Sequence, residues 1–169
     1  MRLFAPLALV MMLAGCGLQP VYGGGGSGPV AQTLAAISVA QIPDRAGYLL
    51  RNALLQRLGT PAETPRLRLE VELDDQITGF GIRGDNSIAR ERRTLRARYR
   101  VVAIATGAVL LDATAGSDVG IDRVSSDYAV VAAETTALDR LAVEVAAQIT
   151  ARIAEVTRAG TLEVSPLPK

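Results

Sequence analysis

The chain has 169 residues, enough for one domain with a sizeable core, and carries 18 basic and 17 acidic side chains, no histidine and a single cysteine. A charge balance so close to neutrality argues against nucleic acid as a partner. Without histidine or a second cysteine, the sequence excludes serine–histidine–aspartate and cysteine–histidine nucleophiles, as well as zinc sites ligated by histidine or cysteine.

At the N-terminus, an apolar run of about a dozen residues follows Arg2 and ends in small residues, which is typical of a secretory signal peptide. The run is too short to cross the ~30 Å hydrocarbon core of a membrane as a helix. The tetrapeptide Leu-Ala-Gly-Cys that ends at Cys16 resembles the bacterial lipobox, in which the peptide is cut before the cysteine and the cysteine is acylated. We therefore expect residues 1–15 to be a signal peptide and Cys16 to be the lipidation site. An ordinary secretory signal with an incidental cysteine is the alternative.

Residues 23–28 have the sequence Gly-Gly-Gly-Gly-Ser-Gly, which is typical of a flexible linker. A phosphate-binding loop does not fit, because no strand precedes this segment and no Gly-Lys-Ser/Thr follows it. Residues 16–28 are thus expected to be the lipidated cysteine and its linker.

A short strand and a helix are expected next. Residues 36–42 alternate weakly between apolar and polar side chains, which predicts a short strand. Pro43-Asp44 predicts a stop followed by a helix N-cap, and a helix is expected over residues 45–58 because its leucines recur every four residues. Gly59 is expected to end this helix.

Two strands follow, over residues 66–76 and 90–105. The first alternates strictly, with apolar side chains at odd positions and charged ones at even positions. In the second, Leu95 to Ala103 are apolar at odd positions, and arginines lie at even positions. Gly79, Gly81 and residues 84–87 predict the turn between them. If the hairpin turns about Asp85, the numbers of directly paired residues sum to about 170. The charged pairs are then Asp74 with Arg96, Glu72 with Arg98 and Glu70 with Arg100.

The last part of the domain is expected to hold a third strand of the meander, a polar loop and a long helix. The strand is predicted over residues 109–116 and the loop over 116–126. The helix begins after a cap at Ser126 or Asp127 and ends near Arg158. Its apolar stripe is Val131, Leu138, Leu141, Val145, Ile149, Ile153 and Val156.

The order strand, helix, three strands, helix predicts an α+β fold. We expect a two-layer sandwich in which a small, mainly antiparallel four-stranded sheet carries two helices packed on one face. This domain is expected to span residues 29–160, followed by a flexible tail over 161–169.

Arginines are concentrated in residues 83–100, where seven of them accompany two acidic residues. The arginines opposite the acidic strand are expected to form a salt-bridge ladder. The others lie near the hairpin tip beside Phe80, Ile82 and Ile88, without acids on the partner strand. Guanidinium groups bind phosphate bidentately, so cations mixed with apolar side chains suit an amphiphile with a phosphorylated head. The residues expected to contact such a ligand are Arg83, Arg90, Arg92 and Arg93. The alternative is that these arginines form a solvated surface or contact the surface of another protein.

No catalytic constellation is evident in the sequence. Asp74 and Asp75 are adjacent residues of a strand, so their side chains point to opposite faces and cannot share a site. The serines at 125–126 have no base nearby in the sequence. We expect a binding or assembly protein rather than an enzyme, without a cofactor or a catalytic metal.

The octapeptide that begins at Cys16, Cys-Gly-Leu-Gln-Pro-Val-Tyr-Gly, resembles the start of mature lipopolysaccharide (LPS)-assembly lipoproteins of the LptE family, of the alphaproteobacterial type. The predicted order of elements over residues 16–158 agrees with the fold of that family. The resemblance implies a lipid-anchored protein on the periplasmic side of the outer membrane. It also implies that the protein plugs and helps to assemble the LptD β-barrel and takes part in LPS delivery to the cell surface. The implied partners are an LptD-like barrel, LPS and the membrane; an accessory subunit of an ABC-type lipid transporter is the alternative.

Overall fold

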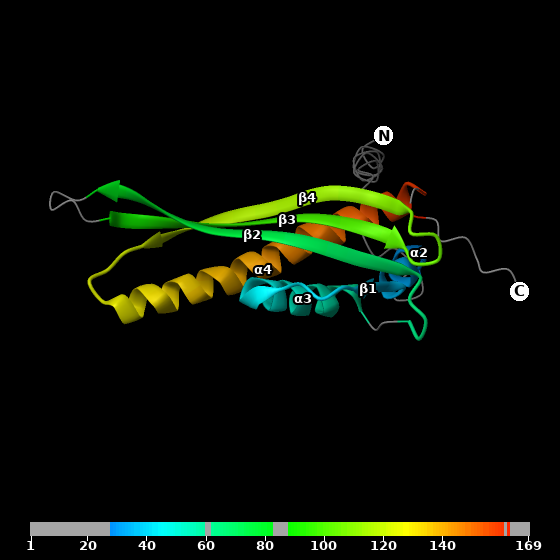
Figure 1. Cartoon of the computed structure of the whole chain (residues 1–169), viewed down its shortest axis with the longest axis horizontal. Coiled ribbons are helices and arrows are strands. Elements are labelled where there is room, and N and C mark those ends of the chain that lie inside the picture. Colours follow the sequence, from blue (N-terminus) through cyan, green and yellow to red (C-terminus); the bar gives the residue numbers. More distant parts are fainter. Residues whose placement is uncertain (1–27, 60–61, 83–87, 161, 163–169) are drawn as a thin grey trace, which may run out of the picture.

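The structure, a computed structural model, describes residues 28–59, 62–82, 88–160 and 162. It has an α+β arrangement in which the long helices lie on one side of an open sheet (Figure 1). The elements in chain order are α2 (Pro29–Ala35), β1 (Ile37–Val39), α3 (Asp44–Leu58), β2 (Leu67–Ile82), β3 (Ile88–Ala103), β4 (Val109–Asp122) and α4 (Asp127–Arg158). Cys16 and Arg83 lie outside the described residues.

The four strands follow one another in the order β1-β2-β3-β4. β1 pairs with β2 in parallel, whereas the other two pairings are antiparallel, so the sheet is mixed. The described part of the chain forms three helices instead of the two that we predicted. Helix α2 was missed although Pro29 occupies a favoured first helical position and Val30 and Leu34, four residues apart, are both buried.

The register of the central hairpin is as predicted, with Asp74 opposite Arg96 and Glu72 opposite Arg98. Both strands are longer at the hairpin end than their patterns indicated. Gly79, expected in the turn, is paired with Glu91 inside the ladder. Cross-strand pairing thus outweighs the weak strand propensity of glycine. The expected turn residues 84–87 lie outside the described residues.

β4 corrects the prediction for residues 116–126. In place of a polar loop, the strand continues to Asp122, which pairs with Arg90. The sequence of this stretch is poor in apolar residues, but β3 extends alongside it and supplies hydrogen-bond partners over its whole length.

Helix α3 begins at Asp44, after Pro43 in the N-cap position, and no side chain caps it, so the predicted Asp44 cap does not form. The helix starts tightly against the segment that leaves β1. A Cβ atom at Gly47 would lie 2.6 Å from the carbonyl oxygen of Ile42, so only glycine permits this approach.

Helix α4 follows the prediction closely. The Ser126 side chain accepts a hydrogen bond from the Ala129 backbone N–H, and the helix runs to Arg158. Its predicted stripe is buried except for Val131, which is 60% exposed and is replaced in the core by Val130. No helix in the described part of the chain is both long and apolar enough to cross a membrane.

The core lies between the inner face of the sheet and the helices, towards the β1 end of the molecule. The fully buried side chains include Leu69 and Val101 from the sheet, Leu54 from α3 and Ile149 from α4. Leu162, within the expected tail, is also buried in this cluster at 1% exposure.

Candidate functional site

The open face of the sheet, away from the helices, carries a row of arginines on β3. This arginine row consists of Arg90, Arg92, Arg96, Arg98 and Arg100. Acids flank it on both sides, three from β2 (Glu70, Glu72, Asp74) and three from β4 (Asp112, Asp118, Asp122). With Arg68 of β2, six arginines face six carboxylates, so the face has no net charge.

Two of the predicted site residues, Arg90 and Arg92, lie on this face near the hairpin tip. Arg90 Nε is 2.7 Å from Asp122 Oδ1, and Arg92 Nε is 3.4 Å from Asp118 Oδ2. The expectation that they lack acidic partners was therefore wrong, because β4 extends through the predicted loop and brings Asp118 and Asp122 beside them. Both arginine side chains are more than half exposed, at 62% and 57%. Arg92 also lies over the Phe80 ring, 5.4 Å from its centroid, within the range of a cation–π interaction.

Arg93, the third described site residue, lies on the opposite, helix-covered face. Its Nε and Nη2 donate to the two oxygens of Asp75 at 2.9 and 2.6 Å, and its Nη1 donates to the carbonyl oxygen of Glu134 at 2.8 Å. The bond to Asp75 is the main cause that raises the Arg93 pKa. The side chain is only 12% exposed. Its contacts join β2, β3 and α4, so they stabilise the fold.

The remaining arginines were predicted to form a ladder with β2, and they bind carboxylates on both neighbouring strands. Arg98 donates from Nε and Nη2 to the two oxygens of Asp112 on β4, at 3.2 and 2.9 Å. This contact lowers the pKa of the Asp112 carboxyl. Arg100 lies 3.4 Å from Glu70 and 3.8 Å from Glu72, so the ladder is only partly the one predicted.

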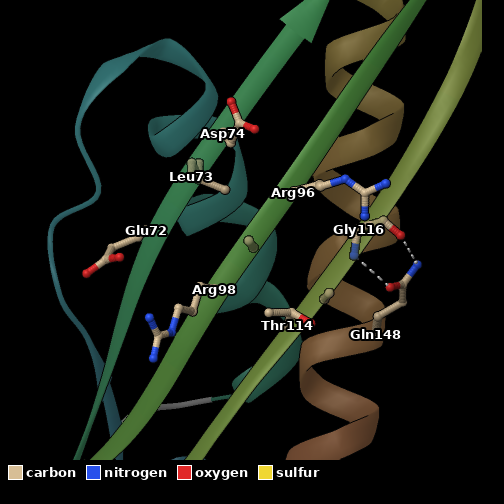
Figure 2. Close-up of a pocket in the computed structure, with 10 residues that line it drawn as sticks. Glu72, Leu73, Asp74, Arg96, Arg98, Thr114, Gly116 and Gln148 are labelled. Carbon is tan, nitrogen blue, oxygen red and sulfur yellow. Dashed lines mark hydrogen bonds between the residues drawn. The ribbon is translucent and has the colours of Figure 1, made fainter.

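Arg96 is the exception within the row. Among the described residues, no carboxylate lies within ion-pair distance of it, although Asp74 is its register partner. In Figure 2 the Arg96 side chain extends towards Gly116 on β4, while Asp74 points away from it. A depression of about 520 Å³ surrounds this position, lined in part by Glu72, Arg98 and Gln148. The site is accessible, holds both signs of charge and contains no nucleophile–base pair. No cluster of potential metal ligands occurs in the part of the chain that the structure describes.

Glu91 is a notable residue that sequence reasoning did not single out. It is 6% exposed, and its Oε1 lies 2.8 Å from Arg123 Nη1, while its Oε2 is buried without a hydrogen-bond partner among the residues that the structure describes. This ion pair links β3 to the segment that connects β4 with α4, in which Arg123 lies. The only signal in the sequence was a charged residue at an odd, inward-facing position of the strand.

Comparison with known proteins gives a match to one family. The family model described as "LptE: Lipopolysaccharide-assembly" matches residues 32–153. A search of curated proteins gave no match.

Several solved structures share the fold. A protein of Caulobacter crescentus CB15 described as a candidate lipoprotein is 26% identical, with a TM-score of 0.64, and the match covers 78% of this chain and 98% of that one. A minor lipoprotein of Acinetobacter baumannii is 13% identical, with a TM-score of 0.55 and coverage of 70% and 88%. Lipoprotein B of Nitrosomonas europaea is 14% identical, with a TM-score of 0.56 and coverage of 73% and 83%.

Proposed function

Because the chain belongs to the LptE family of lipopolysaccharide-assembly proteins, we propose that it is an outer-membrane lipoprotein that helps to assemble the LptD β-barrel, plugs it and takes part in LPS delivery to the cell surface. The observation that carries this proposal is the family match, which begins in α2 and includes the whole sheet and most of α4. The role is one of binding and assembly, without a catalysed reaction.

Co-purification from cells tests this function. The tagged protein is expected to bring down a detergent-stable, heat-modifiable β-barrel, and its depletion is expected to lower the amount of LPS at the cell surface. Recovery of an inner-membrane transporter complex in place of the barrel would contradict the proposal and favour an accessory subunit of a lipid transporter.

The lipid anchor is the part of the proposal that rests on Cys16. Two or more acyl chains give stable membrane attachment, whereas one chain gives marginal binding. Labelling cells with a radioactive fatty acid is expected to mark the wild-type protein and not the Cys16→Ser variant. Label in the variant would show that Cys16 is not the acylated residue.

We propose that Arg90 and Arg92 contact the LPS phosphates. Each is bound to a carboxylate through a single nitrogen–oxygen contact and is largely exposed, so a phosphate, with its greater charge and bidentate geometry, can compete for it. Phe80, 40% exposed beside Arg92, offers an apolar contact for the lipid. Arg83 remains a candidate on the sequence alone, and Arg93 would have to leave Asp75 to take part.

Two pairs of substitutions with opposite expected effects test this contact. Arg90→Gln with Arg92→Gln is expected to weaken binding to purified LPS about tenfold, and more strongly at low salt, where screening is least. Asp118→Asn with Asp122→Asn removes the competing carboxylates and is expected to strengthen binding. Unchanged affinity in both double variants would exclude the tip as the LPS contact while leaving the barrel partnership to the co-purification test.

A further inference from the structure

β4 is an outer strand of the sheet, and one side chain already binds its free edge. Among the described strands, β4 pairs with β3 on one side only. On the other side, Gln148 of α4 accepts a hydrogen bond from the Gly116 backbone N–H and donates one to the Gly116 carbonyl oxygen, both at 3.2 Å (Figure 2). The amide thus makes the two bonds that a residue of a neighbouring strand would make.

The bonds to Gly116 define which backbone groups face outwards. In an antiparallel pair, residues alternate between bonding their partner and pointing away from it. Asp118, Gly120 and Asp122 therefore present their N–H and carbonyl groups on the same side as Gly116. Within the described residues, no side chain other than Gln148 binds this row. An unpaired row of this kind is a template for strand addition.

A groove beside this edge has room for the side chains of an added strand. It measures about 390 Å³ and lies between residues 119–122 of β4 and the facing side of α4. The α4 side chains that line it are mostly small: Ala132, Ala133, Thr136 and Ala137, with Arg140 also present. Small or medium apolar side chains on one face of an added strand would fit there.

The charge of β4 indicates the chemistry of the other face of such a strand. The open-face positions of β4 from 112 to 122 hold three aspartates and no cation. Asp118 and Asp122 are 56% and 75% exposed, and each binds its arginine through one oxygen. Pairing with β4 of a second copy would bring aspartates of like charge together, which is unfavourable. A strand with arginine or lysine at alternate positions would instead extend the alternation of acidic and basic strands.

We propose that the free edge of β4 binds an extended strand of a partner protein in which basic residues alternate with small or medium apolar ones, and that Gln148 closes this edge in the absence of the partner. The inference does not depend on LPS binding at the arginines.

A synthetic peptide of ten residues, alternating arginine and valine, is the direct probe. Fluorescence anisotropy is expected to show binding to the wild-type protein. A peptide with the same side chains and N-methylated backbone nitrogens cannot donate backbone hydrogen bonds, so it is expected to bind at least about tenfold more weakly. Equal binding of the two peptides would reduce the interaction to charge attraction and overturn the proposal.

Gly120 allows a matched pair of variants. A Cβ atom built at Gly120 meets no atom within 4 Å, so alanine fits at this position without a clash. Gly120→Pro removes one outward N–H and is expected to weaken peptide binding about tenfold, whereas Gly120→Ala keeps the N–H and is expected to stay within about twofold of the wild type. Equal affinities for the two variants would contradict strand addition at β4.

Gln148→Ala tests the closing role. It removes the competing amide and is expected to raise peptide affinity about threefold or more, while Glu144→Ala, an exposed change one turn earlier on α4, is expected to leave it unchanged. Weaker peptide binding by Gln148→Ala would show that the glutamine does not compete with the peptide for the edge of β4. A peptide-free dimer in sedimentation experiments that Gly120→Pro abolishes would assign the edge to a second copy and overturn the basic partner.

Discussion

At the residue scale, the arginines of β3 differ in how firmly carboxylates hold them. Arg93 and Arg98 each bind both oxygens of one aspartate. Arg90 and Arg92 bind a single oxygen, and Arg96 has no carboxylate partner among the described residues. Breaking one contact between a guanidinium and a carboxylate costs less free energy than breaking two. The number of these contacts therefore ranks how available each arginine is to an anionic ligand.

Arg93 is expected to contribute to stability. Arg93→Gln removes its bonds to Asp75 and Glu134 in a mostly buried setting, so the free energy of unfolding is expected to fall by about 1.5–3 kcal/mol. Arg92→Gln is the control, because its exposed ion pair is worth at most about 1 kcal/mol. Urea denaturation measures both, and equal losses would show that Arg93 does not act as a structural link.

The pKa of Asp112 is expected to depend on Arg98. The bidentate contact lowers the pKa of the carboxyl in the folded protein. Its stabilising effect is therefore present above the ordinary carboxyl pKa of about 3.9 and is lost as the pH falls through the lower, folded value. Carboxyl NMR titration is expected to show a rise in the Asp112 pKa in Arg98→Gln and none in the distant variant Arg90→Gln. No rise in the first variant would mean that the contact does not persist in solution.

At the scale of single elements, α4 is buried along most of its length and exposes apolar side chains near its start. The buried residues of α4 run from Val130 to Val156, whereas Tyr128 and Val131, near its start, project into solvent at 86% and 60% exposure. The helix therefore supports the sheet over most of its length and adds exposed apolar surface at the end where β4 stops.

Two valines of α4 that lie two residues apart test its packing. Val145 is fully buried and Val143 is 51% exposed. Val145→Asp places an unpaired charge in the core and is expected to cost several kcal/mol, which is a large part of the ~5–15 kcal/mol that stabilises such a domain. Val143→Asp is expected to melt within a few degrees of the wild type, and a similar melting temperature for both variants would contradict the orientation of the helix.

At the scale of the whole molecule, the core occupies only one part of an elongated shape. β2 and β3 extend as a ribbon well past α3 (Figure 1). The core cluster reaches Val71 and Leu95, whereas Ile77 and Phe80, further along β2, are 43% and 40% exposed. The hairpin end thus carries the arginines Arg90 and Arg92 on strands with little apolar burial.

Hydrogen exchange is expected to follow this division. Amides of the ladder near Leu69 and Val101 are expected to open only with global unfolding, because these side chains are fully buried. Amides near Thr78 and Arg92 are expected to exchange at least about tenfold faster through local opening of the hairpin end. Uniform protection along β2 and β3, measured by NMR, would contradict a one-sided core.

The amino-acid sequence alone determined the features that depend on local periodicity. Alternation of period two predicted the inner face of β2 and β3 and the register that pairs Asp74 with Arg96. Helical spacing and the Ser126 cap predicted α4. These patterns can be recognised in the sequence because side chains on the same face of a strand or helix recur at a fixed interval.

Only the tertiary structure decided the length of β4 and the partners of the arginines. Arg93 meets Asp75 and Glu134, which lie 18 and 41 residues away, and Gln148 reaches Gly116 across 32 residues. Leu162, past the end of α4, is held in the core by the same kind of distant contact. Which carboxylate an arginine binds, and how far a glycine-containing strand continues, depend on what the neighbouring strand and helix place alongside, and no local repeat in the sequence encodes that.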